Sequence, residues 1–348
     1  MSALHSLPWL GDAWQQLSAR EASPAHALLI HGAEGIGKLA LGRAWAQRIL
    51  CEATPGAFAC GQCDGCHWFL GGQHPDYRQI QPEALAGVEV DAELPVSASK
   101  TAKPSLEIKV DQIRALSVFL NTQSHRGRRR VVVVHPAEAM NTNAANSLLK
   151  SLEEPPSGAC FILVSNNRDQ LIPTIRSRCV DIAVVSPSWS TALDWLKKER
   201  VDDPEIWLGL AGGAPLLARD RAEHADAKRV LQLVTALRAC DRGALEAWNP
   251  TDRVELELFT ELLQKYAHDQ VRLLGGGASI FFPELKIKNN PTLPKERPNN
   301  DRPGPARAAS LVAWLSYARH VGKQRSLASH PLNPRLFALD LLSGLPQA

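Results

Sequence analysis

The sequence lacks three features that mark large classes of protein. No stretch is long and apolar enough to span a bilayer. The first twenty residues have neither the basic start nor the unbroken apolar run of a signal peptide. An excess of one charge is also missing, since 39 Lys and Arg oppose 36 Asp and Glu for a net +3, so overall charge does not demand a nucleic-acid partner. We therefore expect a soluble cytoplasmic protein.

Disulfides are not expected in that compartment, so the seven cysteines need another explanation. Four of them follow the spacing C-x8-C-x2-C-x2-C: Cys51, Cys60, Cys63 and Cys66. Such density suits a tetrahedral structural Zn²⁺ site. Because four thiolates close the coordination sphere, the metal would hold the fold together and take no part in catalysis. The alternative is a set of free thiols, with Cys51 buried on its helix.

The 348 residues are enough for two or three domains, and the first half alternates strand-like and helical segments. Apolar, β-branched runs predict strands at 26–32, 131–134, 159–167 and 177–185, with a short one at 108 leading into a helix whose expected N-cap is Asp111. Helical spacing predicts helices over 38–50 and 141–156, and Pro155 should stop the second. This alternation predicts an α/β domain with a parallel sheet.

After Ser186-Pro187-Ser188, which is typical of a linker, the chain becomes mainly helical. We expect a small helical domain over 187–228 and a larger one over 229–348. The segment 283–305 is rich in Pro, Asn and charge, which predicts a disordered loop. A second polar loop is expected at 92–107.

Residues 31–40, HGAEGIGKLA, come close to the phosphate-loop pattern G-x-x-x-x-G-K-[ST]. Gly32, Gly37 and Lys38 are present, but Leu39 stands where a hydroxyl would ligate Mg²⁺. The position between a strand and a helix is the context that such a loop requires. The simpler interpretation is a strand–helix turn that binds nothing.

A working ATPase also needs an acidic residue where a later strand ends. The strand 131–134 is followed by His135-Pro136. Glu138 lies about one helical turn further on, where a surface carboxylate is the expected role. Two metal-handling positions are lost together, which suggests that hydrolysis has been abandoned.

Three charged segments remain open to more than one interpretation. Glu153 and Glu154 end a helix at its C-terminus, where the helix dipole disfavours them by a few tenths of a kcal/mol. Such violations often mark interfaces, although a solvated helix end tolerates them.

Arg176 and Arg178 precede the last strand, where an arginine can act as an arginine finger or lie in a surface salt bridge. The basic run 126–130 fits a solvated turn or a nucleic-acid contact.

The motifs GAEGIGK, the four cysteines, HPDY (74–77), NSLLKSLEEPP and SRC occur in this order. Together they resemble the bacterial DNA polymerase III clamp-loader subunits of the AAA+ class, over residues 24–185. Within that family the chain resembles the delta-prime type. The ATP-hydrolysing motor keeps a Ser or Thr after the loop lysine, an Asp-Glu pair at the strand end and a sensor arginine. Here Leu39, His135-Pro136 and Leu216 match those positions.

The resemblance implies a RecA-like AAA+ domain with an inserted zinc module (51–66) over residues 1–186. A helical lid (187–228) and an all-α collar (229–348) would follow. It also implies a five-membered ring, with motor ATPase and delta-like subunits, that loads the sliding clamp onto primed DNA. Arg178 would project into a neighbour's ATP site, and Asn166 would occupy the polar sensor position.

Two other functions are compatible with the motifs. Lys38, with Gly32 and Gly37, could hold ATP in an active AAA+ enzyme that recruits Glu138 for its metal. Alternatively, Cys60–Cys66 and Arg126–Arg130 could contact DNA in a zinc-dependent binding module, which predicts salt-dependent binding.

Overall fold

The computed structural model describes residues 6–21, 25–53, 58–86, 104–122, 129–283, 305–328, 330 and 332–346. The expected loops at 92–107 and 283–305 and the basic run at 126–130 lie largely outside the described residues. The chain divides into two compact units, Met1–Pro187 and Ser188–Ala348. A further division at residue 228 stays a prediction.

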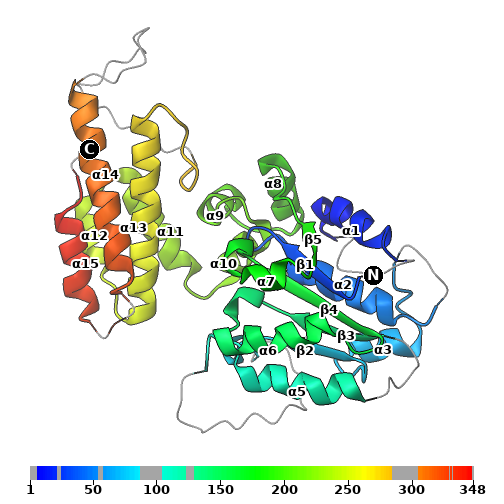
Figure 1. Ribbon diagram of the computed structural model, residues 1–348. Helices are drawn as coiled ribbons and strands as arrows, with labels where there is room; N and C mark the ends of the chain where they lie inside the picture. Colours follow the sequence, from blue (N-terminus) through cyan, green and yellow to red (C-terminus); the bar gives the residue numbers. More distant parts are fainter. Residues whose placement is uncertain are drawn as a thin grey trace. The chain divides into compact units, whose positions relative to one another are not determined.

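The first unit is built on a five-stranded parallel sheet with the order β2-β3-β4-β1-β5 (Figure 1). The strands are β1 (Ala27–His31), β2 (Tyr77–Ile80), β3 (Arg130–Val134), β4 (Ala159–Ser165) and β5 (Val180–Ala183). The α-helices are α1 (Gly11–Ser18), α2 (Lys38–Leu50), α3 (Asp64–Leu70), α4 (Glu83–Ala86), α5 (Val110–Asn121), α6 (Thr142–Glu153) and α7 (Pro173–Arg176). Short 3-10 turns lie at η2 (Pro8–Leu10), η3 (Ala137–Ala139) and η4 (Arg168–Gln170).

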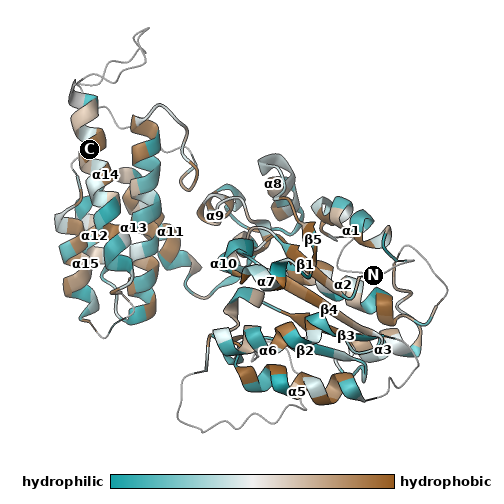
Figure 2. Ribbon diagram, in the orientation of Figure 1, coloured by the Kyte–Doolittle hydropathy of each residue, from teal (hydrophilic) through white to brown (hydrophobic). Residues whose placement is uncertain are grey.

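The central strands are buried on both faces, as their β-branched composition predicts. Val132 lies opposite Phe161 in the register, and Val133 opposite Ile162. Since side chains alternate along a strand, these two pairs point to opposite faces of the sheet. In Figure 2 strand β4 is brown along its length, whereas the long helix α13 of the second unit alternates between brown and teal.

Each face of the sheet has its own helical cover. Val132 and Phe161 belong to one buried cluster with residues of α5 and α6. On the other face α2 approaches closely, because a Cβ on Gly42 would stand 3.3 Å from the Ile162 side chain. Helix α6 ends before Pro155, as the sequence predicts.

The sequence analysis was wrong about one strand and one helix cap. The expected strand at 108 is a single bridge between Ile108 and Met140. The fifth strand is β2, immediately after HPDY, and its two central residues are only partly buried, so it forms no apolar run. The N-cap of α5 is Lys109, while Asp111 lies within the first turn.

The second unit is helical. It contains α8 (Trp189–Lys198), α9 (Pro204–Leu210), α10 (Pro215–Glu223), α11 (Ala227–Ala239), α12 (Arg242–Trp248), α13 (Arg253–Leu274), α14 (Pro305–Arg325) and α15 (Pro334–Ser343). No helix among the described residues of either unit combines the length and hydrophobicity needed to span a membrane.

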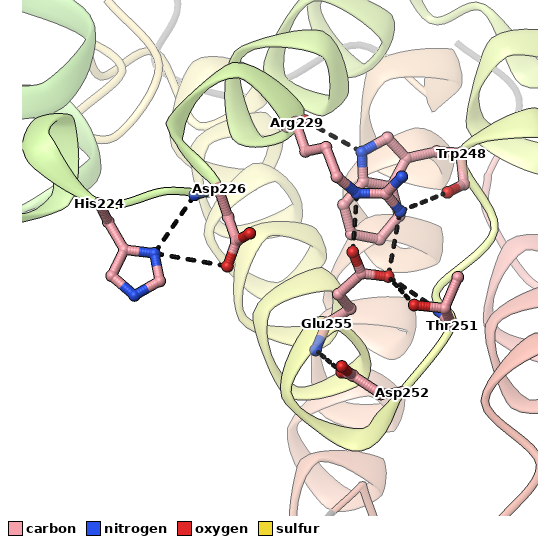
Figure 3. Close-up of polar contacts among 7 residues, drawn as sticks. All are labelled: His224, Asp226, Arg229, Trp248, Thr251, Asp252 and Glu255. Carbon is pink, nitrogen blue, oxygen red and sulfur yellow. Dashed lines mark hydrogen bonds and ion pairs between the residues drawn. The ribbon is translucent and has the colours of Figure 1, made fainter.

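Polar side chains join three of these helices (Figure 3). Arg229 of α11 stacks on the ring of Trp248 of α12, with its guanidinium carbon 4.7 Å from the ring centroid. The same guanidinium forms an ion pair with Glu255 of α13, at 2.7 Å. Trp248 Nε1 in turn donates to the Arg229 carbonyl. This arrangement fixes α11, α12 and α13 against one another and needs no ligand.

Candidate functional site

The loop between β1 and α2 contains glycines in backbone conformations that other residues rarely adopt. Gly37 adopts φ 93° at the N-cap of α2, a left-handed conformation that favours glycine. Gly32 also has a positive φ, of 153°, and a Cβ there would lie 2.4 Å from the Val184 carbonyl oxygen. The backbone conformation therefore favours glycine at both positions, whether or not a nucleotide binds.

Lys38 is turned inward. Only 3% of the residue is exposed, and its Nζ donates to the carbonyl of Ala33 in the same loop. Burial lowers the pKa of Lys38 to about 8, against the opposing field of Glu138 and Glu34. The lysine thus finds its hydrogen-bond acceptor and its compensating charges within the protein.

Glu138 corrects an expectation, because it is not a surface carboxylate. It is partly buried, and its Oε1 accepts a hydrogen bond of 2.9 Å from the Asn166 backbone N–H at the end of β4. Its negative charge acts on both Lys38 and His135. Burial nevertheless lowers the pKa of His135. The structure thus brings Lys38, His135, Glu138 and Asn166 together at the carboxyl edge of the sheet.

The N-terminal segment contributes a contact that sequence reasoning missed. Trp9 Nε1 donates a 2.8 Å hydrogen bond to the carbonyl of Ile36, inside the loop. Leu7 and Leu10 on either side are buried. The apolar residues ahead of α1 were the available signal, but they do not reveal which segment they cover.

The four cysteines meet in one cluster. Their Sγ atoms all lie within 4.8 Å of one another, with Cys51–Cys63 at 4.0 Å and Cys60–Cys66 at 3.9 Å. Four ligands at a Zn–S distance of ~2.3 Å would stand ~3.8 Å apart at the corners of a tetrahedron. The cluster therefore has the dimensions to hold a metal ion.

Backbone N–H groups point at the sulfurs, which also fits a thiolate site. Cys60 Sγ accepts from the N–H groups of Gln62 and Cys63 at 3.4 and 3.3 Å. These bonds lower the pKa of the Cys60 thiol to about 6. Burial raises the pKa of the Cys66 thiol, so its thiolate form calls for a compensating cation. A divalent metal would supply that charge.

The loop and the cysteine cluster lie at opposite ends of α2. Lys38 is its first residue and Cys51 its C-cap. A 13-residue helix is about 20 Å long at ~1.5 Å per residue. A metal held by the cysteines is therefore too distant to act on a phosphate at the loop.

Arginines and carboxylates alternate around α7. Arg168 binds Asp181 through both Nε and Nη2, at 3.3 and 2.6 Å. Arg176 contacts Asp169 at 2.8 Å. Arg168 and Arg176 therefore each have an anionic partner nearby. For Arg176 this is the surface salt bridge that the sequence left open as an alternative.

Arg178 is paired with the end of helix α6. Its Nη2 lies 2.6 Å from Glu153 Oε1, and the two side chains are 34% and 49% exposed. Its Nη1 donates to the Thr174 carbonyl at 2.9 Å. The structure therefore unites the two unexplained charged motifs, SLEEPP and SRC, at one edge of the first unit.

The parallel sheet, the loop between β1 and α2 and the helical second unit together define an α/β protein of the AAA+ type. A model of the family described as DNA polymerase III, delta subunit, matches residues 12–187. The chain belongs to this family.

Curated relatives agree with the family model. The protein named DNA polymerase III subunit delta′ from Pseudomonas aeruginosa is 43% identical over 216 residues, which cover 61% of this chain and 60% of that protein. Its namesake from Escherichia coli (strain K12) is 32% identical over 213 residues, which cover 60% and 58%. The match thus spans about three fifths of these relatives. The resemblance to delta-prime clamp-loader subunits is confirmed.

Among solved structures, a DNA polymerase III gamma subunit-related protein from Thermotoga maritima is similar. It is 19% identical, with a TM-score of 0.44, over 95% of this chain and 98% of that one.

Proposed function

We propose that the chain is a non-hydrolysing subunit of a DNA polymerase III clamp loader. It would assemble in the cytoplasm with motor ATPase and delta-like subunits into a five-membered ring that loads the sliding clamp onto primed DNA. The family match over the first unit supports this role. Within the ring, Arg178 would enter the ATP site of the neighbouring motor subunit and stabilise charge on the transferred phosphate.

One observation carries the non-hydrolysing part of the proposal. Lys38 donates to its own loop at Ala33 and is compensated by Glu138, while Leu39 offers no hydroxyl to Mg²⁺. Gly32, Gly37 and Lys38 would then be the remnant of a nucleotide site. The active-ATPase alternative requires Glu138 as a metal ligand, but the Asn166 N–H already binds one of its oxygens.

We further propose that the metal of the cysteine cluster is Zn²⁺. Four cysteine sulfurs at tetrahedral spacing favour zinc over cations that prefer oxygen ligands. Cys51, Cys60, Cys63 and Cys66 would hold it as a closed structural site. The ion would tie the end of α2 to the start of α3.

The test is ATP turnover, measured with the purified chain alone and with the reconstituted complex. The chain alone, with Mg²⁺ and primed DNA, should show no turnover above background. In the complex, Arg178→Ala should lower kcat strongly, because an arginine finger contributes about 10³–10⁵-fold at the site it serves.

Arg114→Ala is the matched control, since Arg114 is an exposed arginine with a weaker 3.5 Å ion pair on α5. It should leave turnover unchanged. Turnover by the chain alone that disappears in Lys38→Ala would instead establish the active-ATPase alternative. Normal turnover by the Arg178→Ala complex would remove the arginine-finger role and leave the family assignment intact.

A further inference from the structure

Local stability does not account for the carboxylate of Glu153. It ends helix α6, where the helix dipole disfavours negative charge. Its ion pair with Arg178 is half exposed on the Glu153 side, and such pairs contribute little to stability. What the pair does achieve is to hold the guanidinium in one place.

Both partners stand on rigid supports. Leu152, next to Glu153, is 2% exposed, and Ile175 in α7 is fully buried. The two apolar residues belong to the same buried cluster. Pro155 prevents α6 from continuing. The core therefore fixes the separation between the end of α6 and the turn that carries Arg178.

Two of the three guanidinium nitrogens of Arg178 have partners. Nη2 contacts Glu153 at 2.6 Å, while Nη1 donates to the Thr174 carbonyl at 2.9 Å and to Ser177 Oγ at 3.4 Å. Among the residues that the structure describes, the Nε–H of Arg178 donates to no partner. In Arg168, by contrast, Nε and Nη2 are both used by Asp181.

We propose that Glu153 is a positioning residue for Arg178, orienting the guanidinium toward a phosphate bound by the neighbouring subunit. The inference rests on the proposed function of Arg178 in that subunit's site. An arginine side chain loses much rotamer freedom when it is ordered. A carboxylate that orders it beforehand lowers the cost of reaching the transition state, without contacting the phosphate itself.

The experiment measures ATP turnover per assembled complex, reconstituted from the motor subunit, the delta-like subunit, the clamp and this chain on primed DNA. Glu153→Ala should lower kcat about three- to tenfold and change KM for ATP less than twofold, because orientation and not nucleotide binding is lost. Glu153→Gln should turn over at a rate between that of the alanine variant and the normal rate, since its amide oxygen can still lie beside Nη2 but the ion pair is lost.

A double-mutant cycle tests whether Glu153 acts through Arg178. The combined Glu153→Ala and Arg178→Ala variant should be no slower than Arg178→Ala alone. Glu154→Ala is the matched control, because Glu154 is the next carboxylate and forms no ion pair among the described residues. It should turn over at the normal rate.

The possible failures are distinguishable. A normal rate for Glu153→Ala, with a slow Arg178→Ala complex, overturns the positioning role and leaves the proposed function standing. Additive losses in the double variant overturn it as well, since the two residues would then act independently. A normal rate for Arg178→Ala would instead refute the arginine-finger function itself. Gel filtration checks that each complex assembles. If the Glu153→Ala complex fails to assemble, Glu153→Gln replaces it in the comparison, and a normal rate for that variant overturns the positioning role.

Discussion

Lys38 shows at the residue scale how the protein itself satisfies a buried ammonium group. Burying an ammonium group without a partner is costly. The carbonyl of Ala33 and the field of Glu138 supply an acceptor and a compensating charge. The second partner was not predictable from the motif, because Glu138 lies on a different segment that only the sheet brings near.

The lowered pKa of Lys38 predicts a pH dependence of stability. The folded protein releases this proton near pH 8 and the unfolded chain near 10.5. Between these values the unfolded state binds more protons, so the free energy of unfolding should rise with pH. Relative to Lys38→Met, the rise should be on the order of 3 kcal/mol at most. Urea unfolding of both proteins from pH 7.5 to 10.5 measures it, and parallel curves would contradict the shift.

The cysteine module shows at the element scale what spacing can predict. Its ligands fall in one short segment, so their convergence was predictable without the rest of the fold. What the sequence does not contain is the environment of each sulfur. Cys51 and Cys66 are buried, whereas Cys60 is exposed. Phe69 of α3 also packs edge-on against Tyr77 of β2, with ring centroids 4.7 Å apart. The module therefore joins the sheet through an apolar contact.

Removal of the metal should loosen this element locally. Cys60→Ser should lose the proposed zinc and increase hydrogen exchange over 58–72. We expect a stability loss on the order of 3 kcal/mol. This is well below the roughly 10–16 kcal/mol of zinc-finger peptides, because the rest of the unit folds around its own core.

Cys240→Ser is the control for the metal, since Cys240 belongs to the second unit, where it contacts Tyr266 of the same unit. It should retain one zinc per chain by elemental analysis. A tetrahedral thiolate absorption spectrum after cobalt replacement would identify the geometry. Metal-free protein with an unchanged exchange pattern in this segment would refute the site.

At the scale of the whole molecule, the second unit has a core and internal ties of its own. Tyr266 packs against Trp314 with ring centroids 5.6 Å apart. Asp269 is fully buried and accepts hydrogen bonds from the backbone N–H groups of three successive residues, Ile280, Phe281 and Phe282. Glu261 of α13 pairs with Arg221 of α10 and with Lys265. Helices α10 and α13 are therefore joined by partly buried charges.

These ties predict how fragments will behave. The fragment 188–348 should unfold cooperatively by circular dichroism, with a free energy of at least about 5 kcal/mol. The fragment 229–348 lacks Arg221 and should be less stable by a few kcal/mol, because part of a partly buried ion network is broken. Equal stability of the two would show that the boundary predicted at residue 228 separates independent domains.

The sequence by itself determined the features that depend on contiguous residues. These are the β-branched central strands, the glycine-lysine loop, the end of α6 before Pro155 and the cysteine spacing. Tertiary structure alone decided the partly exposed strand β2, which has no apolar run, and the contacts of Glu138 with Asn166 and of Glu153 with Arg178. The physical reason is that such contacts join residues far apart in the chain. Their energy depends on burial and distance, and neither exists until the sheet has formed.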